Sequence, residues 1–216
     1  MDVLISCFRP QADGAWYMYA IAFVGAFALA IAIERLYYIM VRSNINASKF
    51  MAEIRKLAKA GEYKKALALC EAAPQKALPT VVGAGLRIVA ESETTDFRTI
   101  QNRVDEGTLE IIPKLQARTG FLPLLANVAT LLGLMGTIWG LIIAFRSVSA
   151  AGIDAAEKAR MLAAGIYTAM NTTLLGLAVA IPTILIYAFL HNKTAKIIDE
   201  IDEHTVKLIN LLTGNR

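Results

Sequence analysis

Hydroxyl and amide side chains occur inside two long apolar segments of this sequence. Their steps of three and four residues place several of them on shared helix faces. Such groups can hold water or hydrogen-bond a carboxyl group, but they do not titrate usefully themselves. We therefore predict that they line a polar, partly hydrated path through a membrane. The residues predicted to line this path are Thr137, Thr168, Asn171, Thr172 and Thr173.

Small residues accompany these polar ones in both segments. Glycine lets helices approach closely in lipid, and Gly136 with Gly140 forms a GxxxG pair. The residues predicted to serve helix packing are Gly133, Gly136, Gly140, Gly176 and Pro182. A purely structural interpretation stays open, because threonine can bond its own preceding carbonyl and glycine can simply permit packing.

The two segments contain no group that could relay a proton. Residues 119–145 and 161–190 hold no Asp, Glu, Lys or Arg. Ionisable residues inside a membrane are costly and usually functional, so their absence is informative. If the protein conducts protons, the carboxylate must come from another chain.

The elements that carry these residues are predicted to be membrane helices. The chain has 216 residues, of which 56% are hydrophobic, and residues 15–33 form a third stretch without charge. Each stretch is near or above the roughly 20 residues that a helix needs to cross the hydrocarbon core. Unpaired backbone groups are not tolerated in lipid, so each stretch should be helical. We expect an all-α integral membrane protein with three transmembrane helices, the second and third extended into a cytoplasmic helical bundle.

The distribution of basic residues predicts the orientation. Residues 42–118 hold thirteen Lys and Arg, whereas only Arg9 precedes the first span. The excess of positive charge belongs on the cytoplasmic side. We expect a periplasmic N-terminus at 1–14, transmembrane helices at 15–40, 119–146 and 161–190, a cytoplasmic helical region at 41–118, a periplasmic loop at 147–160, and a cytoplasmic C-terminal helix at 191–216. Tyr37 and Tyr38 would belong to the inner aromatic belt.

Turn signals divide the predicted cytoplasmic region into short helices. Gly61 is predicted to be a C-terminal cap, and a later helix is expected from about Thr80, after Pro79. The C-terminal segment should continue the third membrane helix. His191 and His204 are expected at the membrane interface and the surface. We find no catalytic constellation, metal-ligand spacing, phosphate-binding loop or nucleic-acid patch, so neither enzyme activity nor a cofactor is expected.

Two blocks of sequence resemble a known family. They are Leu-Gly-Leu-Met-Gly-Thr-Ile-Trp-Gly at residues 132–140 and the segment 165–182, which ends in Ala-Val-Ala-Ile-Pro. Both are similar to the MotA/TolQ/ExbB proton-channel family, on its shorter ExbB/TolQ side. The resemblance implies a pentamer in the bacterial inner membrane around a dimeric ExbD/TolR-like partner, which carries a membrane aspartate. Proton flow would move that partner and transmit force across the periplasm. Thr137 and Thr173 match the family's pore-lining threonines.

The sequence departs from the family pattern at one position. ExbB/TolQ chains commonly carry Glu where this chain has Thr168. The departure leaves open whether the ion is the proton or Na⁺, and which envelope process is driven. Two other interpretations remain. A non-conducting scaffold would organise a partner, and a small transporter would need a broken helix or buried charge at mid-membrane, for which Pro182 is the only hint.

Overall fold

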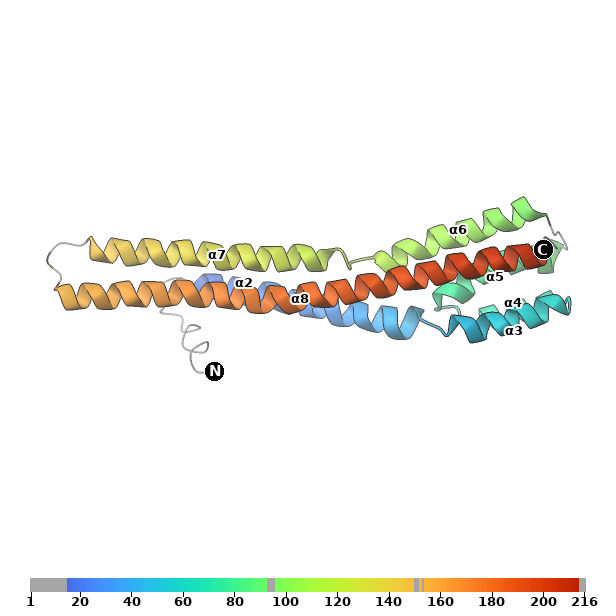
Figure 1. Ribbon diagram of the computed structural model, residues 1–216, viewed down its shortest axis with the longest axis horizontal. Helices are drawn as coiled ribbons and strands as arrows, with labels where there is room; N and C mark the ends of the chain where they lie inside the picture. Colours follow the sequence, from blue (N-terminus) through green and yellow to red (C-terminus); the bar gives the residue numbers. More distant parts are fainter. Residues whose placement is uncertain (1–14, 93–95, 150–151, 153, 214–216) are drawn as a thin grey trace. The chain divides into compact units, whose positions relative to one another are not determined.

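The computed structural model describes residues 15–92, 96–149, 152 and 154–213, and its regular elements over these residues are helices, with no strand (Figure 1). In chain order they are α2 (Ala15–Tyr37), η1 (Tyr38–Ser43), α3 (Ala47–Lys59), α4 (Tyr63–Glu71), α5 (Ala77–Ser92), α6 (Phe97–Gln116), α7 (Phe121–Val148) and α8 (Ala155–Leu212). The predicted all-α class is confirmed. The predicted periplasmic N-terminus at 1–14 lies outside the described residues, as do positions 150, 151 and 153 of the predicted loop.

Three helical stretches in this part of the chain are long and apolar enough to cross a membrane. They lie within Ala15–Lys59, Phe97–Val148 and Ala155–Leu212. Each contains one of the charge-free segments, so the prediction of three candidate spans is confirmed. Large apolar side chains are exposed along the apolar segments of α2, α7 and α8, which suits contact with lipid or with other apolar helices.

The chain divides into two units. The membrane unit comprises residues up to Ile33 together with Arg118–Ala188, and the bundle unit comprises Glu34–Ala117 and Phe189–Arg216. Helix α8 continues without a break from one unit into the other, because it is a single helix of 58 residues. The expectation that the C-terminal segment continues the third apolar helix is therefore confirmed.

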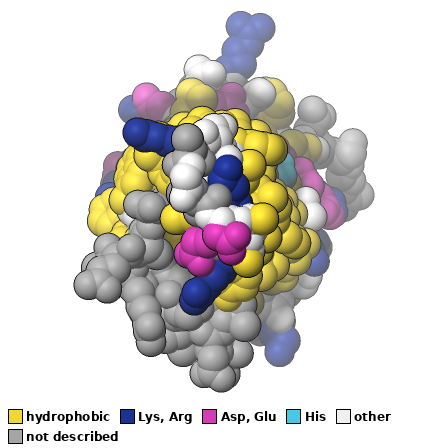
Figure 2. All heavy atoms as spheres, turned by 90° about the vertical axis from the view of Figure 1, so that its left-hand side faces the viewer, with side chains coloured by type: hydrophobic (Ala, Val, Ile, Leu, Met, Phe, Trp, Pro, Cys, Tyr) yellow, Lys and Arg dark blue, Asp and Glu magenta, His cyan; other side chains and the backbone are white. Residues whose placement is uncertain are grey.

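In the membrane unit, α7 and α8 run antiparallel and are joined by a short connection (Figure 1). Figure 2 views the end where they join, and charged side chains gather there with hydrophobic side chains around them. Charged residues near this connection include Arg146, Asp154 and Glu157. Charge at the end of an otherwise apolar helix pair is the pattern expected where membrane helices reach water.

In the bundle unit, amphipathic helices bury one apolar face each. Met51, Ile54, Leu86, Ile100 and Leu208 are fully buried. Polar side chains begin two of the helices: the amide oxygen of Asn46 accepts a hydrogen bond from the backbone N–H of Lys49, and the carboxylate of Asp96 accepts one from the backbone N–H of Thr99. These caps satisfy N–H groups that a helix start leaves unpaired.

One expected helix start needs correction. Helix α5 begins at Ala77 rather than near Thr80, so Pro79 lies in its first turn. Proline is tolerated there because the N–H groups of the first turn have no partner within the helix. The chain turns between α6 and α7 at Arg118, whose φ of 59° is left-handed. Gly61, also left-handed at φ 75°, follows α3 as expected.

Candidate functional site

Glycines make the contact between α7 and α8. A Cβ atom on Gly136 would lie 2.7 Å from the side chain of Thr172, and one on Gly140 would lie 2.9 Å from the carbonyl oxygen of Gly165. On α8, a Cβ atom on Gly176 would lie 2.7 Å from the carbonyl oxygen of Ala129. The helices are therefore closer than any larger side chain at these positions would allow.

The α7–α8 pair has two edges, and helix α2 lies along one of them. On α7, Trp139 immediately precedes the contact residue Gly140, and its ring centroid is 6.4 Å from that of Tyr17 on α2. On α8, Val179 immediately precedes the buried Ala180 and contacts Gly25 of α2, with a Cγ atom 3.0 Å from where a Cβ atom of Gly25 would be. Residues that precede contact positions thus face α2.

The opposite edge carries Thr137 and Thr173. Each immediately follows a contact residue, Gly136 or Thr172, and one residue turns an α-helix by about 100°. Because the two helices are antiparallel, residues that follow contact positions lie on the same side of the pair. Thr137 and Thr173 therefore lie on the same side of the pair, away from α2. We call this side the threonine edge; Thr130, one heptad before Thr137, belongs to it.

The five predicted path residues therefore occupy three different places. Thr137 and Thr173 lie on the threonine edge and are partly exposed. Thr172 lies inside the α7–α8 contact and is 1% exposed. Thr168 and Asn171 precede contact residues and lie toward α2, where Asn171 is 6% exposed. A path-lining role for all five remains a prediction, and the geometry favours the two on the threonine edge.

The hydroxyl groups on the threonine edge are hydrogen-bonded to helix carbonyls. Thr137 donates to the carbonyl of Leu134 at 2.5 Å, and Thr173 donates across the helix pair to the carbonyl of Gly133 at 3.3 Å. Thr130 donates to Ala126 at 3.1 Å. A hydroxyl has one donor and two acceptor lone pairs. With the donors engaged, this edge offers acceptors to water or to a protonated acid.

The carbonyl oxygen of Gly133 is a hydrogen-bond acceptor on this edge that the sequence pattern did not single out. Its neighbour in space is the Thr173 hydroxyl, forty residues later in the chain. The absence of a side chain on Gly133 lets α8 come close, since a Cβ atom there would lie 3.1 Å from the Thr172 carbonyl oxygen. The signal that could have found it is the pairing of a glycine on one helix with a threonine on the next.

Two other residues that the sequence analysis singled out, Pro182 and His204, lie elsewhere on α8. Pro182 sits within α8, where its missing N–H leaves the carbonyl four residues earlier without its usual partner. His204, expected at the surface, is 8% exposed in the bundle unit, so that prediction is wrong. Burial of the ring lowers the pKa of His204 below its usual value. The negative charge of Glu203 opposes this shift, and the positive charge of Arg55 adds to it.

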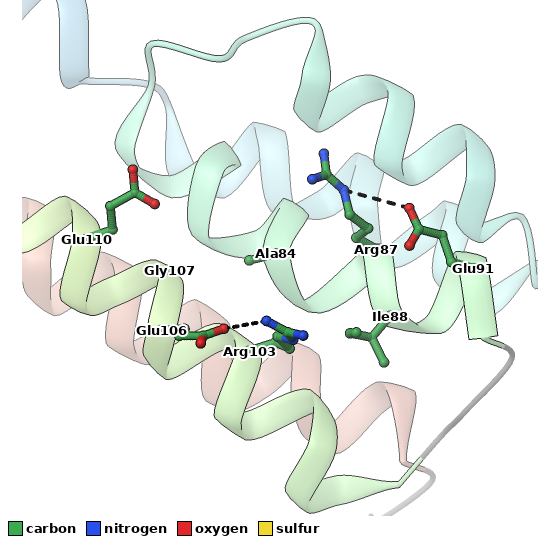
Figure 3. A pocket seen from close by; sticks show the side chains of 8 residues that line it. All are labelled: Ala84, Arg87, Ile88, Glu91, Arg103, Glu106, Gly107 and Glu110. Atoms are coloured by element: carbon green, nitrogen blue, oxygen red, sulfur yellow. Dashed lines mark hydrogen bonds and ion pairs between the residues drawn. The ribbon is translucent and has the colours of Figure 1, made fainter.

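The bundle unit has a groove between α5 and α6. Figure 3 shows Arg87 directed toward Glu91 and Arg103 directed toward Glu106, with Ala84 between them. The pairs are 4.0 Å and 2.7 Å apart. Because both arginines are already ion-paired, this groove does not favour an anion. Within the described ranges, no group of three or more His, Cys, Asp or Glu could hold a metal ion.

The fold defines a multi-pass helical membrane protein. Its threonine edge is polar and lies along two close-packed helices whose apolar segments contain no acidic residue. Residues 73–203 match the MotA/TolQ/ExbB proton channel family, and this is more than half of the chain. The chain therefore belongs to that family, which is a proton-channel family rather than a family of enzymes.

Two curated relatives are similar to this chain. The "Putative biopolymer transport protein ExbB homolog" of Methanothermobacter thermautotrophicus is 28% identical over 205 residues, covering 94% of this chain and 67% of that protein. The "Tol-Pal system protein TolQ" of Haemophilus influenzae is 38% identical over 76 residues, covering 35% of this chain and 32% of that protein. The chain thus aligns with about two thirds of the first relative and about a third of the second.

Proposed function

We propose that this protein is the ring-forming subunit of an ion-driven motor in a bacterial inner membrane. Several copies, in our proposal five, surround the membrane helices of an ExbD/TolR-like partner. The partner contributes an aspartate within the membrane, and ion flow past it is converted into mechanical work across the envelope. The N-terminus would be periplasmic and the C-terminus cytoplasmic, as the basic residues indicate.

The observation that carries this proposal is the chemistry of the threonine edge. The hydroxyl groups of Thr137 and Thr173 donate to helix carbonyls. Their oxygens can still accept a hydrogen bond from a protonated carboxyl group, whereas an ionised carboxylate would have to compete with those carbonyls for the hydroxyl donor. An aspartate that passes this edge is therefore favoured in its neutral, proton-carrying form.

In this proposal, the carboxyl group that carries the proton comes from another chain. The apolar segments 119–145 and 161–190 contain no Asp or Glu, and desolvation makes a carboxylic acid the expected proton carrier at membrane depth. A partner helix with one carboxyl group would complete the path. The position of α2 supports this arrangement, because α2 covers the other edge of the α7–α8 pair and leaves the threonine edge available to face a central helix.

The test is a double substitution that removes both hydroxyls and keeps their shape. We expect Thr137→Val with Thr173→Val to abolish gradient-driven proton uptake into liposomes that contain this protein and its partner. Oligomer size, measured by native mass spectrometry, should be unchanged. The matched control is Thr183→Val. Like Thr137, Thr183 donates its hydroxyl to a carbonyl of its own helix, at 2.7 Å, but the residue is buried, with 7% exposed.

The same experiment separates the motor from the non-conducting scaffold. A scaffold would bind its partner and show no flux in the unsubstituted protein. Full flux in the double variant would remove both threonines from the mechanism. Loss of flux in Thr183→Val as well would mean that hydroxyls matter for helix packing rather than for the path.

A further inference from the structure

The end of α2 is an unusual structure with a cluster of cations. Residues Tyr38–Ser43 form a π-helix, η1, whose hydrogen bonds span five residues rather than four. Such wide turns are rare in proteins, and those that occur often lie at functional sites. Its inner face is buried through Ile39 and Ser43, while Arg42 is exposed on the other side.

Arg42 lies close to an aromatic ring. Residues four apart lie on the same face of a helix, so Arg42 follows Tyr38 along one face of η1. The Arg42 guanidinium carbon is 5.7 Å from the Tyr38 ring centroid, and that of Arg35 is 4.5 Å from it. Cations at these distances are attracted by the ring. Arg35 is 4% exposed and donates to the carbonyl of Lys114, so Arg42 is the arginine that can reach a ligand.

A lysine from another part of the bundle unit holds the turn in place. The Lys76 ammonium donates to the carbonyl of Val41 at 2.6 Å and to that of Asn44 at 2.7 Å. Carbonyls at a helix end lack partners within the helix, and a cation there is favourable. Because Lys76 is engaged by these carbonyls, its role here is to position the turn.

Exposed apolar side chains stand beside Arg42. Tyr37 is 63% exposed, Met40 44% and Val41 54%. They continue the apolar stretch of α2, one of the three candidate spans. Aromatic and apolar side chains next to a cation at the end of a span match the depth of lipid headgroups and upper acyl chains.

We propose that Arg42 and Tyr38, with the apolar side chains beside them, bind the phosphate of an anionic phospholipid headgroup. The guanidinium of Arg42 donates to the phosphodiester oxygens in the forked geometry that suits them, and the Tyr38 ring orients it. Tyr37, Met40 and Val41 contact the acyl chains. A lipid is favoured over free phosphate because the apolar surface adjoins the charge. An anionic lipid is favoured over a zwitterionic one because η1 carries the exposed Arg42 and no acidic residue.

The test measures lipid binding to the purified full-length protein, with no partner and no ion gradient, so its result is independent of the proposed motor function. Native mass spectrometry would compare retention of phosphatidylglycerol with that of phosphatidylcholine. We expect the unsubstituted protein to prefer phosphatidylglycerol, and Arg42→Gln to lower that preference about fivefold, the effect of one arginine at an anionic surface. Lys76→Gln should lower it by less, and Arg42→Lys should retain part of it.

The control is Arg103→Gln, which also removes an exposed arginine but one that is paired with Glu106 on α6. Its lipid preference should match that of the unsubstituted protein, and circular dichroism should show all variants equally helical. Equal retention in Arg42→Gln and the unsubstituted protein would overturn the proposal. So would equal losses in Arg42→Gln and Arg103→Gln, which would indicate bulk charge alone. Displacement of the lipid by millimolar inorganic phosphate would make the site one for free phosphate and would contradict the lipid assignment.

Discussion

Substituting Gly176 by alanine should destabilise the membrane unit, although alanine is the better helix former. A Cβ atom at this position would lie 2.7 Å from the carbonyl oxygen of Ala129, about 0.7 Å inside the 3.4 Å at which ordinary contact begins. That oxygen belongs to the backbone of α7 and cannot move alone. The α7–α8 pair must therefore separate, which also lengthens the hydrogen bond between Thr173 and Gly133.

The size of the effect follows from two opposing contributions. Forcing an extra carbon into a packed contact costs about 1–3 kcal/mol. Replacing glycine by alanine inside a helix contributes about 1 kcal/mol in the other direction. The expected net loss in the free energy of unfolding is therefore up to about 2 kcal/mol, which should lower the unfolding temperature by several degrees.

Two other glycines provide graded comparisons. A Cβ atom on Gly25 would meet the Val179 side chain at 3.0 Å, and a side chain can shift more readily than a backbone, so Gly25→Ala should lose less. Gly120 has nothing within 4 Å of its Cβ position, so Gly120→Ala should lose nothing. Thermal unfolding of all three variants in one detergent would measure the order. Equal unfolding temperatures for Gly176→Ala and Gly120→Ala would refute the packing argument.

Two further predictions concern the bundle unit. Burial lowers the pKa of His204, so the unfolded chain binds a proton there more readily than the folded chain. The free energy of unfolding should therefore fall as the pH drops below about 6.5. In chemical denaturation, His204→Phe should flatten this pH dependence, and an unchanged slope would contradict the argument. Asn46→Ala should cost about 1 kcal/mol by removing the cap of α3, whereas Asn46→Asp should retain it. Equal losses in Asn46→Ala and Asn46→Asp, measured by the same unfolding method, would show that the cap is not the cause.

Much of the fold could be predicted because its signals are local. Charge-free runs of apolar residues predict spans whatever their neighbours are, and the helical periodicity after residue 190 predicts the continuation of α8. The start of α5 could not be predicted in this way, because proline is common both just before a helix and in its first turn, and Pro79 fits either position. The burial of His204 depends on which elements pack against α8, and periodicity alone does not reveal them.

The candidate site was predictable in its residue types but not in its grouping. The spacing of Thr168, Asn171 and Thr172 predicts a shared face on one isolated helix. In the structure, α7 occupies the side of α8 near Thr172, and α2 occupies the side near Asn171. That division depends on the contact between Gly25 and Val179, which joins residues far apart in the sequence. The threonine edge could therefore be recognised only once all three helices were in place.

Proton flux through the reconstituted protein, with and without its partner, is the most direct measurement of whether the conducting acid is supplied from outside this chain. Liposomes that contain this protein alone should hold an imposed pH gradient as empty liposomes do. Adding the single-span partner should open a proton path, and replacing the partner's membrane aspartate by asparagine should close it. A steady proton current through this protein by itself would contradict the account.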